Sequence, residues 1–213
     1  LNLCKMSVKS CSVNDKNIRH IMWTIPNQIT LFRIVLIPVF IVVFYLPVSW
    51  NHFGAFVVFW FAAISDALDG YLARKLNQSS AFGAFIDPVA DKLMVVAALV
   101  ILIQDLQVWW ISVSAILMIA REIFISALRE FMSSRGKRDI IAVSQLGKYK
   151  TAAQMLGIMG LIWYPTYDIP LILFEFPHEI LLFAAFSFYA IATVLTFWSM
   201  VVYFKAAWPE LSK

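Results

Sequence analysis

Six long apolar segments, separated by short connections, constrain this chain more than any other feature of its sequence. Each is close to the ~20 residues that a membrane-spanning helix requires, and none shows the apolar–polar alternation of a transmembrane β-barrel. Because backbone groups in lipid must form their hydrogen bonds within the segment, we expect helices. The sequence predicts an all-α, integral membrane bundle of six transmembrane helices, at about residues 29–48, 53–75, 83–104, 108–133, 150–165 and 178–204.

The composition excludes an ordinary soluble domain, since 62% of the 213 residues are hydrophobic and only 14% are charged. The net charge of +4 does not indicate a nucleic-acid partner. Basic residues placed among apolar segments report topology, or attraction to anionic lipid in the bilayer, more often than nucleic-acid binding. Both cysteines, Cys4 and Cys11, lie in the polar N-terminal stretch and have no metal-binding spacing.

The distribution of Lys and Arg predicts the orientation of the chain. The connections after the first, third and fifth apolar segments contain neither residue, and Arg121 lies inside the fourth segment. By the positive-inside rule, we expect both termini and the polar chemistry on the cytoplasmic side of the membrane. That side carries Lys5, Lys9, Lys16, Arg19, Arg33, Arg74, Lys75, Lys92, Arg129, Arg135, Lys137, Arg138, Lys148, Lys150, Lys205 and Lys213.

Residues 1–23 are expected to form a tail and a short N-terminal interfacial helix ahead of a membrane domain over residues 24–213. Ile18, Ile21 and Met22 share one face at helical spacing, as an interfacial helix requires. A disordered tail is the alternative for residues 1–13.

Four aspartates lie where the second apolar segment ends and the third begins. Asp66 and Asp69 are spaced i, i+3, and Asp87 and Asp91 are spaced i, i+4, so each pair shares a helical face. Two antiparallel helices joined by a tight turn can bring all four carboxylates together. Small residues that would let a ligand or a backbone come close are interleaved with them: Gly70, Ala73 and Gly83.

Four neighbouring carboxylates repel one another unless they bind protons or cations. Hard oxygen ligands without His or Cys favour Mg²⁺, Mn²⁺ or Ca²⁺. One or two such ions could hold a pyrophosphate and neutralise a leaving phosphate. The rival interpretation is a cation or proton transporter, because acidic residues in spans also line transport routes. Arg74 at the helix end favours a phosphate-bearing ligand.

The aspartate pattern resembles the signature of the CDP-alcohol phosphatidyltransferases without departure. The resemblance implies a six-helix membrane enzyme that transfers a phosphatidyl group from CDP-diacylglycerol to an alcohol and releases CMP. It also implies a site for two divalent cations, Mg²⁺ or Mn²⁺. The matching residues are Asp66, Asp69, Gly70, Ala73, Arg74, Gly83, Asp87 and Asp91.

The same resemblance implies roles for individual residues. Asp66, Asp69 and Asp87 are expected mainly as metal ligands, and Asp91 as both ligand and general base. A base is needed because an alcohol is a poor nucleophile at neutral pH. Asn27 is expected near the cytidine, although a helix cap is the alternative. The other residues expected at the CDP group are Asp66, Asp69, Gly70, Ala73, Arg74 and Gly83.

Basic residues in and after the fourth segment indicate an acceptor that carries its own phosphate. Arg121 and Arg129 are eight residues apart and share a helical face. An arginine as deep as Arg121 needs an anionic partner. Glu122 is expected to point elsewhere, so we expect a substrate phosphate, with Lys148 approaching from the next helix. For Arg129, snorkelling at the helix end is the alternative.

Three segments, at residues 25–33, 120–129 and 147–155, resemble family members whose acceptor is sn-glycerol 3-phosphate. That resemblance implies an enzyme of phosphatidylglycerol and cardiolipin biosynthesis in the bacterial inner membrane. An inositol phosphate is the alternative acceptor. Gly157 and Gly160 are compatible with close helix packing, either within one chain or between the subunits of a homodimer.

Overall fold

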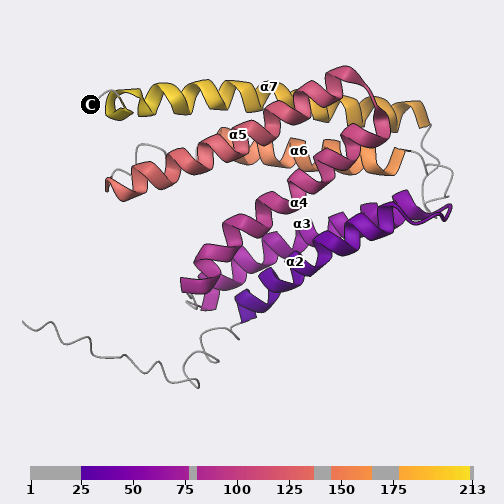
Figure 1. Cartoon of the computed structure of the whole chain (residues 1–213), viewed down its shortest axis with the longest axis horizontal. Helices are drawn as coiled ribbons and strands as arrows, with labels where there is room; N and C mark the ends of the chain where they lie inside the picture. The colour runs from indigo at the N-terminus through magenta and orange to yellow at the C-terminus, as the bar shows by residue number, and fades with distance from the viewer. Residues whose placement is uncertain (1–24, 77–80, 137–144, 165–177, 212–213) are drawn as a thin grey trace, which may run out of the picture.

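The computed structural model describes residues 25–76, 81–136, 145–164 and 178–211, which form six α-helices and no strand (Figure 1). The expected interfacial helix lies outside these residues. Inside the helices, the side chains of residues 66–76, 81–85, 87, 88, 91 and 145–149 also lie outside the description, as do those at 25–27, 178, 210 and 211. The helices are α2 (Ile25–Phe44), α3 (Asn51–Leu76), α4 (Ala81–Leu106), α5 (Trp109–Ser134), α6 (Gln145–Trp163) and α7 (His178–Leu211).

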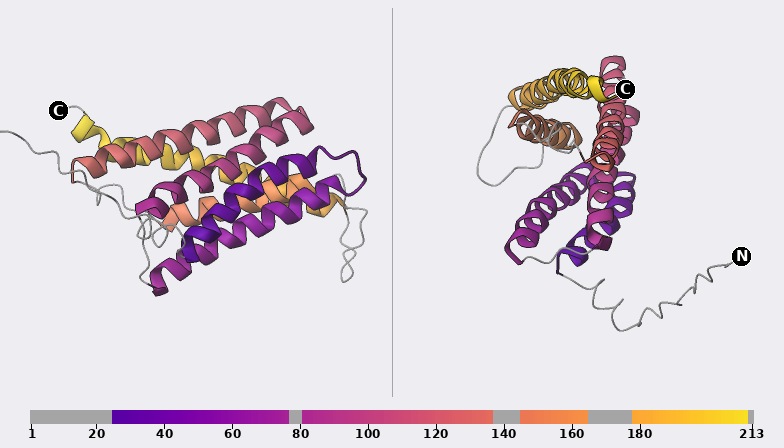
Figure 2. Two further views of the ribbon diagram at one scale, coloured as in Figure 1. Left: turned by 60° about the horizontal axis from the view of Figure 1, so that its bottom comes forward. Right: turned by 90° about the vertical axis from the view of Figure 1, so that its left-hand side faces the viewer.

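Successive helices run in alternate directions. The N-terminal ends of α2, α4 and α6 and the C-terminal ends of α3, α5 and α7 lie at the same end of the molecule (Figures 1 and 2). The connection between α4 and α5 is only Gln107 and Val108, and Gln107 adopts a left-handed φ of 49° that allows this reversal. The described helices thus alternate in direction, as the division of the connections into basic and non-basic ones predicted.

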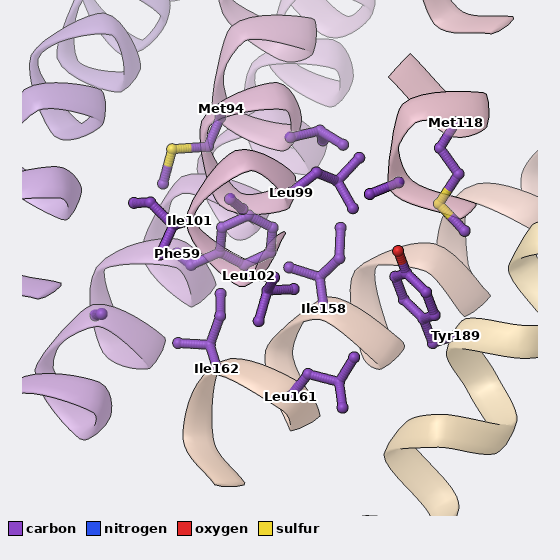
Figure 3. Close-up of a cluster of buried hydrophobic side chains, with 14 of the residues drawn as sticks. Phe59, Met94, Leu99, Ile101, Leu102, Met118, Ile158, Leu161, Ile162 and Tyr189 are labelled. Atoms are coloured by element: carbon purple, nitrogen blue, oxygen red, sulfur yellow. The ribbon is translucent and has the colours of Figure 1, made fainter. Parts of the chain in front are cut away.

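One hydrophobic core joins all six helices. α6 packs most extensively on α7, α2 packs on α3 and α4, and α5 packs on α7 and α4. Figure 3 shows the centre of this core, in which side chains from different helices meet. Its fully buried members include Phe40, Phe59, Leu99, Met118, Ile158 and Tyr189.

Two glycines allow α6 and α7 to approach closely. A Cβ atom added at Gly157 would lie 2.7 Å from the backbone nitrogen of Tyr189, and one at Gly160 would lie 2.6 Å from the Cβ of Ala185. Neither position therefore has room for a larger side chain while the helices stay in place. Of the two uses expected for these glycines, the structure shows packing within the chain.

The outward faces of α5 and α7 are strongly apolar. Trp109 on α5 is 77% exposed and Phe183 on α7 is 75% exposed, and many other large apolar side chains are exposed along both helices. Among the described residues, Trp109–Ser134 and Glu179–Pro209 are long and apolar enough to cross a membrane. Shorter apolar stretches occur at Gln28–Phe44 and Asn51–Ser65. The six predicted helices are thus confirmed, and membrane-spanning length and composition are found for two of them.

Candidate active site

The four aspartates lie on two helices that meet at one end of the bundle. Asp66 and Asp69 are in the C-terminal part of α3, and Asp87 and Asp91 are in the first three turns of α4. Only residues 77–80 separate the two helices. The aspartate side chains lie outside the described residues, so ligation of a metal stays a prediction. Among the described residues, no three His, Cys, Asp or Glu residues form a group that could hold a metal ion.

The other residues expected at the CDP group occupy neighbouring helix ends. Gly70, Ala73 and Arg74 are in the last turns of α3, and Gly83 is in the first turn of α4. Asn27 is in the first turn of α2. These ends of α2, α3 and α4 lie at the same end of the molecule (Figure 1). The backbone thus places all the expected donor-site residues at one end, while their side-chain contacts stay predictions.

A buried polar cluster, formed by Arg121, Glu122, Lys150 and Ser199, joins α5, α6 and α7. The Oε1 atom of Glu122 accepts hydrogen bonds from Nη1 of Arg121 at 2.9 Å and from Nζ of Lys150 at 2.5 Å. Nη2 of Arg121 donates to Oγ of Ser199 at 3.2 Å. Arg121 is 6% exposed and Lys150 is 2% exposed, so the cluster holds two buried cations on one carboxylate.

The expectation that Glu122 points away from Arg121 was wrong. Adjacent side chains leave a helix in different directions, and on that basis the pair was not expected to meet. Both side chains are long, however, and Lys150 on α6 attracts the same carboxylate from across the helix interface. Arg121 therefore has an anionic partner within the protein, and its depth alone does not require a substrate phosphate.

The cluster still has more hydrogen-bond donors than acceptors. An arginine has five N–H donors and a lysine has three. Nε of Arg121 is buried and has no hydrogen-bond partner among the described residues. Lys150 also interacts electrostatically with Arg129. Two buried cations thus share one carboxylate, and a third cation, Arg129, acts on Lys150. Among the described residues, this charge balance suits an additional anion.

Arg121 and Arg129 both face α7, which confirms the shared helical face that their spacing predicted. The guanidinium carbon of Arg129 lies 5.7 Å from the centre of the Tyr203 ring, a cation–π distance, and Arg129 is exposed. Arg121 reaches Ser199 on the same helix. Lys148 lies on α6, two residues before Lys150, and its side chain is outside the described residues.

Comparison with known proteins agrees with the aspartate signature. The sequence profile of the CDP-alcohol phosphatidyltransferases matches residues 23–204. The chain belongs to this family. The matched range includes all six helices up to the last turns of α7.

Relatives with assigned names are similar over nearly their full length. A protein of Yersinia enterocolitica named CDP-diacylglycerol--glycerol-3-phosphate 3-phosphatidyltransferase is 51% identical over 187 residues, which are 88% of this chain and 96% of the relative. A protein of the same name from Escherichia coli K12 is 47% identical over 189 residues, which are 89% of this chain and 97% of the relative.

Sequence reasoning missed three members of the polar cluster in this CDP-alcohol phosphatidyltransferase, Glu122, Lys150 and Ser199. Helical spacing offered a signal for Lys150, because it precedes the buried residues Ala153 and Gln154 by three and four positions. Lys150 therefore lies on the same buried face of α6 as these two residues. No comparable signal existed for Glu122, whose partner lies 28 positions away in the sequence.

Proposed function

We propose that this protein transfers the phosphatidyl group of CDP-diacylglycerol to sn-glycerol 3-phosphate, giving phosphatidylglycerophosphate and CMP. The observation that carries the proposal is 47–51% identity, over 88–89% of the chain, to relatives whose names state this donor and this acceptor. The product would enter phosphatidylglycerol and cardiolipin biosynthesis. The positive polar cluster favours an acceptor that carries a phosphate.

For the donor, we propose a site between the facing ends of α3 and α4. Asp66, Asp69, Asp87 and Asp91 would hold divalent cations. The family resemblance implies two cations in each site. Four carboxylates without His or Cys fit Mg²⁺ or Mn²⁺. The bound cations would neutralise charge on the pyrophosphate and on the leaving CMP. Support comes from the four-residue separation of these helix ends, at residues 77–80.

For the reaction, we propose Asp91 as the general base. The 1-hydroxyl oxygen of glycerol 3-phosphate attacks the β-phosphorus of CDP-diacylglycerol, and the bond from that phosphorus to the oxygen bridging to CMP breaks. Asp91 takes the hydroxyl proton, and CMP leaves with the bonding electron pair. Removing the proton as the bond forms makes the weak alcohol nucleophile competent at neutral pH.

For the acceptor, we propose that Arg121, Arg129 and Lys148 bind the phosphate of glycerol 3-phosphate, together with Lys150. Charge supports this assignment, because the two cations of the cluster, Arg121 and Lys150, share one carboxylate, and Arg129 adds a further positive charge that acts on Lys150. Arginine and lysine N–H groups form strong, charge-assisted hydrogen bonds with phosphate oxygens.

We propose that all six helices span the bacterial cytoplasmic membrane, with both termini and the active site on the cytoplasmic side. The apolar outward faces of α5 and α7 support burial in lipid, since soluble proteins rarely expose such large apolar surfaces. Because the six described helices alternate in direction, the start of α2 and the end of α7 lie at the same end of the molecule (Figure 1). This supports an even number of crossings.

The purified protein with CDP-diacylglycerol and labelled glycerol 3-phosphate tests this function. We expect CMP and labelled lipid to form in equal amounts, EDTA to abolish both, and added Mg²⁺ or Mn²⁺ to restore them. An inositol phosphate offered in place of glycerol 3-phosphate tests the alternative acceptor. Absence of CMP release with any acceptor would favour a transporter, and full turnover without metal would exclude the proposed cation site.

A further inference from the structure

Glu122 links two cations that come from different helices. Its Oε1 atom accepts from Arg121 of α5 and from Lys150 of α6. α6 packs mainly on α7 and α3, whereas α5 packs mainly on α7 and α4. The Glu122–Lys150 ion pair therefore connects α5 directly with α6, although each of these helices packs mainly on other helices.

Lys150 needs the carboxylate of Glu122 to stay both charged and buried. A lysine that is 2% exposed has lost nearly all of its hydration, and a buried cation is strongly unfavourable unless an anion lies beside it. Among the charged groups that interact with Lys150 in the described structure, Glu122 is the anion, whereas Arg121 and Arg129 repel it. Without Glu122, the ammonium group would release its proton or leave the helix interface.

Among the described residues, Glu122 and Ser199 accept hydrogen bonds from three of the N–H donors of Arg121 and Lys150. One N–H of Lys150 and one of Arg121 bond to Glu122, and another of Arg121 bonds to Ser199. Nε of Arg121 stays buried without a hydrogen-bond partner among the described residues. A phosphate monoester, with several acceptor oxygens and two negative charges, matches the remaining donors.

We infer that Glu122 is a positioning residue for the acceptor phosphate, which holds Lys150 and Arg121 between the helices while engaging one N–H group of each. The inference rests on the proposed function, because it assigns the phosphate to sn-glycerol 3-phosphate. In this role Glu122 does not touch the substrate. It keeps two cations charged and in place, and so favours acceptors that carry a phosphate over unphosphorylated alcohols.

Charge-neutral variants separate positioning from simple stabilisation. Glu122→Gln keeps the size of the side chain, and Lys150→Gln introduces a shorter, uncharged polar side chain. Each removes one charge of the ion pair. The double variant replaces the ion pair by two amides, which can hydrogen-bond to each other without a charge. It should recover part of the stability that Glu122→Gln loses, because no buried lysine is then left without an anion, but it cannot recover a cation at position 150.

The experiment compares the three variants with the wild type and with Lys205→Gln, a control at an exposed residue of α7 outside the cluster. For each protein, the KM of glycerol 3-phosphate, the KM of CDP-diacylglycerol and the melting temperature in detergent are measured. We expect the acceptor KM to rise by ~10-fold or more in all three cluster variants, the scale of one lost charge-assisted contact. The donor KM should change by less than about twofold, since the cluster does not hold the donor.

Stability and phosphate binding give a second, independent measurement. We expect the melting temperature to fall in both single variants, most in Glu122→Gln, and to recover in part in the double variant. Inorganic phosphate should raise the melting temperature of the wild type and of Lys205→Gln, but much less that of the cluster variants. If Glu122→Gln fails to fold, Lys150→Gln and the double variant still test the role of the pair.

Three results would overturn the inference. Recovery of the acceptor KM in the double variant would show that the pair only stabilises the fold. A lower acceptor KM in Glu122→Gln would show that Glu122 competes with the phosphate. Equal phosphate stabilisation of the wild type and the cluster variants would place the phosphate elsewhere. Failure of the proposed function looks different: the wild type would release no CMP with glycerol 3-phosphate, whatever the phosphate measurements show.

Discussion

A single buried arginine shows how one side chain can combine structural and binding roles. The guanidinium group of Arg121 connects Glu122 on its own helix with Ser199 on α7. These contacts satisfy part of its donor capacity and keep it inside the bundle. Its Nε has no hydrogen-bond partner among the described residues. Arg121 is thus held by two contacts inside the bundle and keeps a buried donor that no described residue satisfies. A substrate phosphate that reached the cluster could accept from it.

Replacing Arg121 by alanine should weaken the binding of the acceptor more than the binding of the donor. Charge-assisted contacts contribute ~1.5–3 kcal/mol each, so we expect the KM of glycerol 3-phosphate to rise by roughly tenfold or more. The KM of CDP-diacylglycerol should barely change. Ser199→Ala is the control, because it removes the 3.2 Å hydrogen bond and leaves every cation in place. An equal rise in the KM of both substrates in Arg121→Ala would show that Arg121 has only a structural role.

Asp91 is the residue whose substitution should separate chemistry from binding. In Asp91→Asn the amide cannot accept the hydroxyl proton, so we expect turnover to fall by ~10² or more, a typical general-base contribution. Binding of CDP-diacylglycerol, measured directly on the purified variant, should be largely retained. A variant whose whole loss is in donor affinity would show that Asp91 is a ligand and not the base.

At the scale of the helices, hydropathy predicted the number and type of the elements but not all of their bounds, since α6 begins five residues before its predicted start and α7 ends seven residues after its predicted end. Apolar runs predicted six helices, and the observed bounds of α4 and α5 differ from the predicted ones by one or two residues. The contacts between helices were harder to predict from the sequence. Glu122 meets Lys150 through packing of α6 near α5, and no local pattern specifies that packing. The aspartate pattern could be recognised because its residues lie within 26 positions of one another, from Asp66 to Asp91.

The closest helix packing gives a prediction about stability. In Gly157→Ala the new Cβ would meet the backbone of Tyr189, which cannot rotate away, so α6 and α7 must separate. Overpacking of this kind costs about 1–3 kcal/mol, and we expect a clearly lower melting temperature in detergent. Gly54→Ala is the matched control, since its new Cβ would meet side-chain atoms of Val43 and Trp50 that can adjust. Equal melting temperatures for the two variants would contradict tight α6–α7 packing.

Across the whole molecule, charge and helix direction give one consistent picture. The helix ends nearest to most of the Lys and Arg residues lie together at one end of the bundle (Figure 1). The same end carries the aspartate-bearing turns of α3 and α4 and the first turn of α2. A substrate with a lipid tail and a charged nucleotide needs both an apolar flank and a polar end. The bundle offers these next to each other, provided that the polar end faces the cytoplasm.

Labelling of single cysteines tests that orientation. With Cys4 and Cys11 replaced by serine, the chain has no cysteine, and one can be introduced at either end of the bundle. Ser49, between α2 and α3, and Ser134, at the end of α5, are both exposed and lie at opposite ends (Figures 1 and 2). In intact spheroplasts, a membrane-impermeant maleimide should label Ser49→Cys, whereas Ser134→Cys should react only after permeabilisation. The reverse pattern would invert the proposed topology, and labelling of both sites from outside would show that α3, α4 and α5 do not separate them across a bilayer.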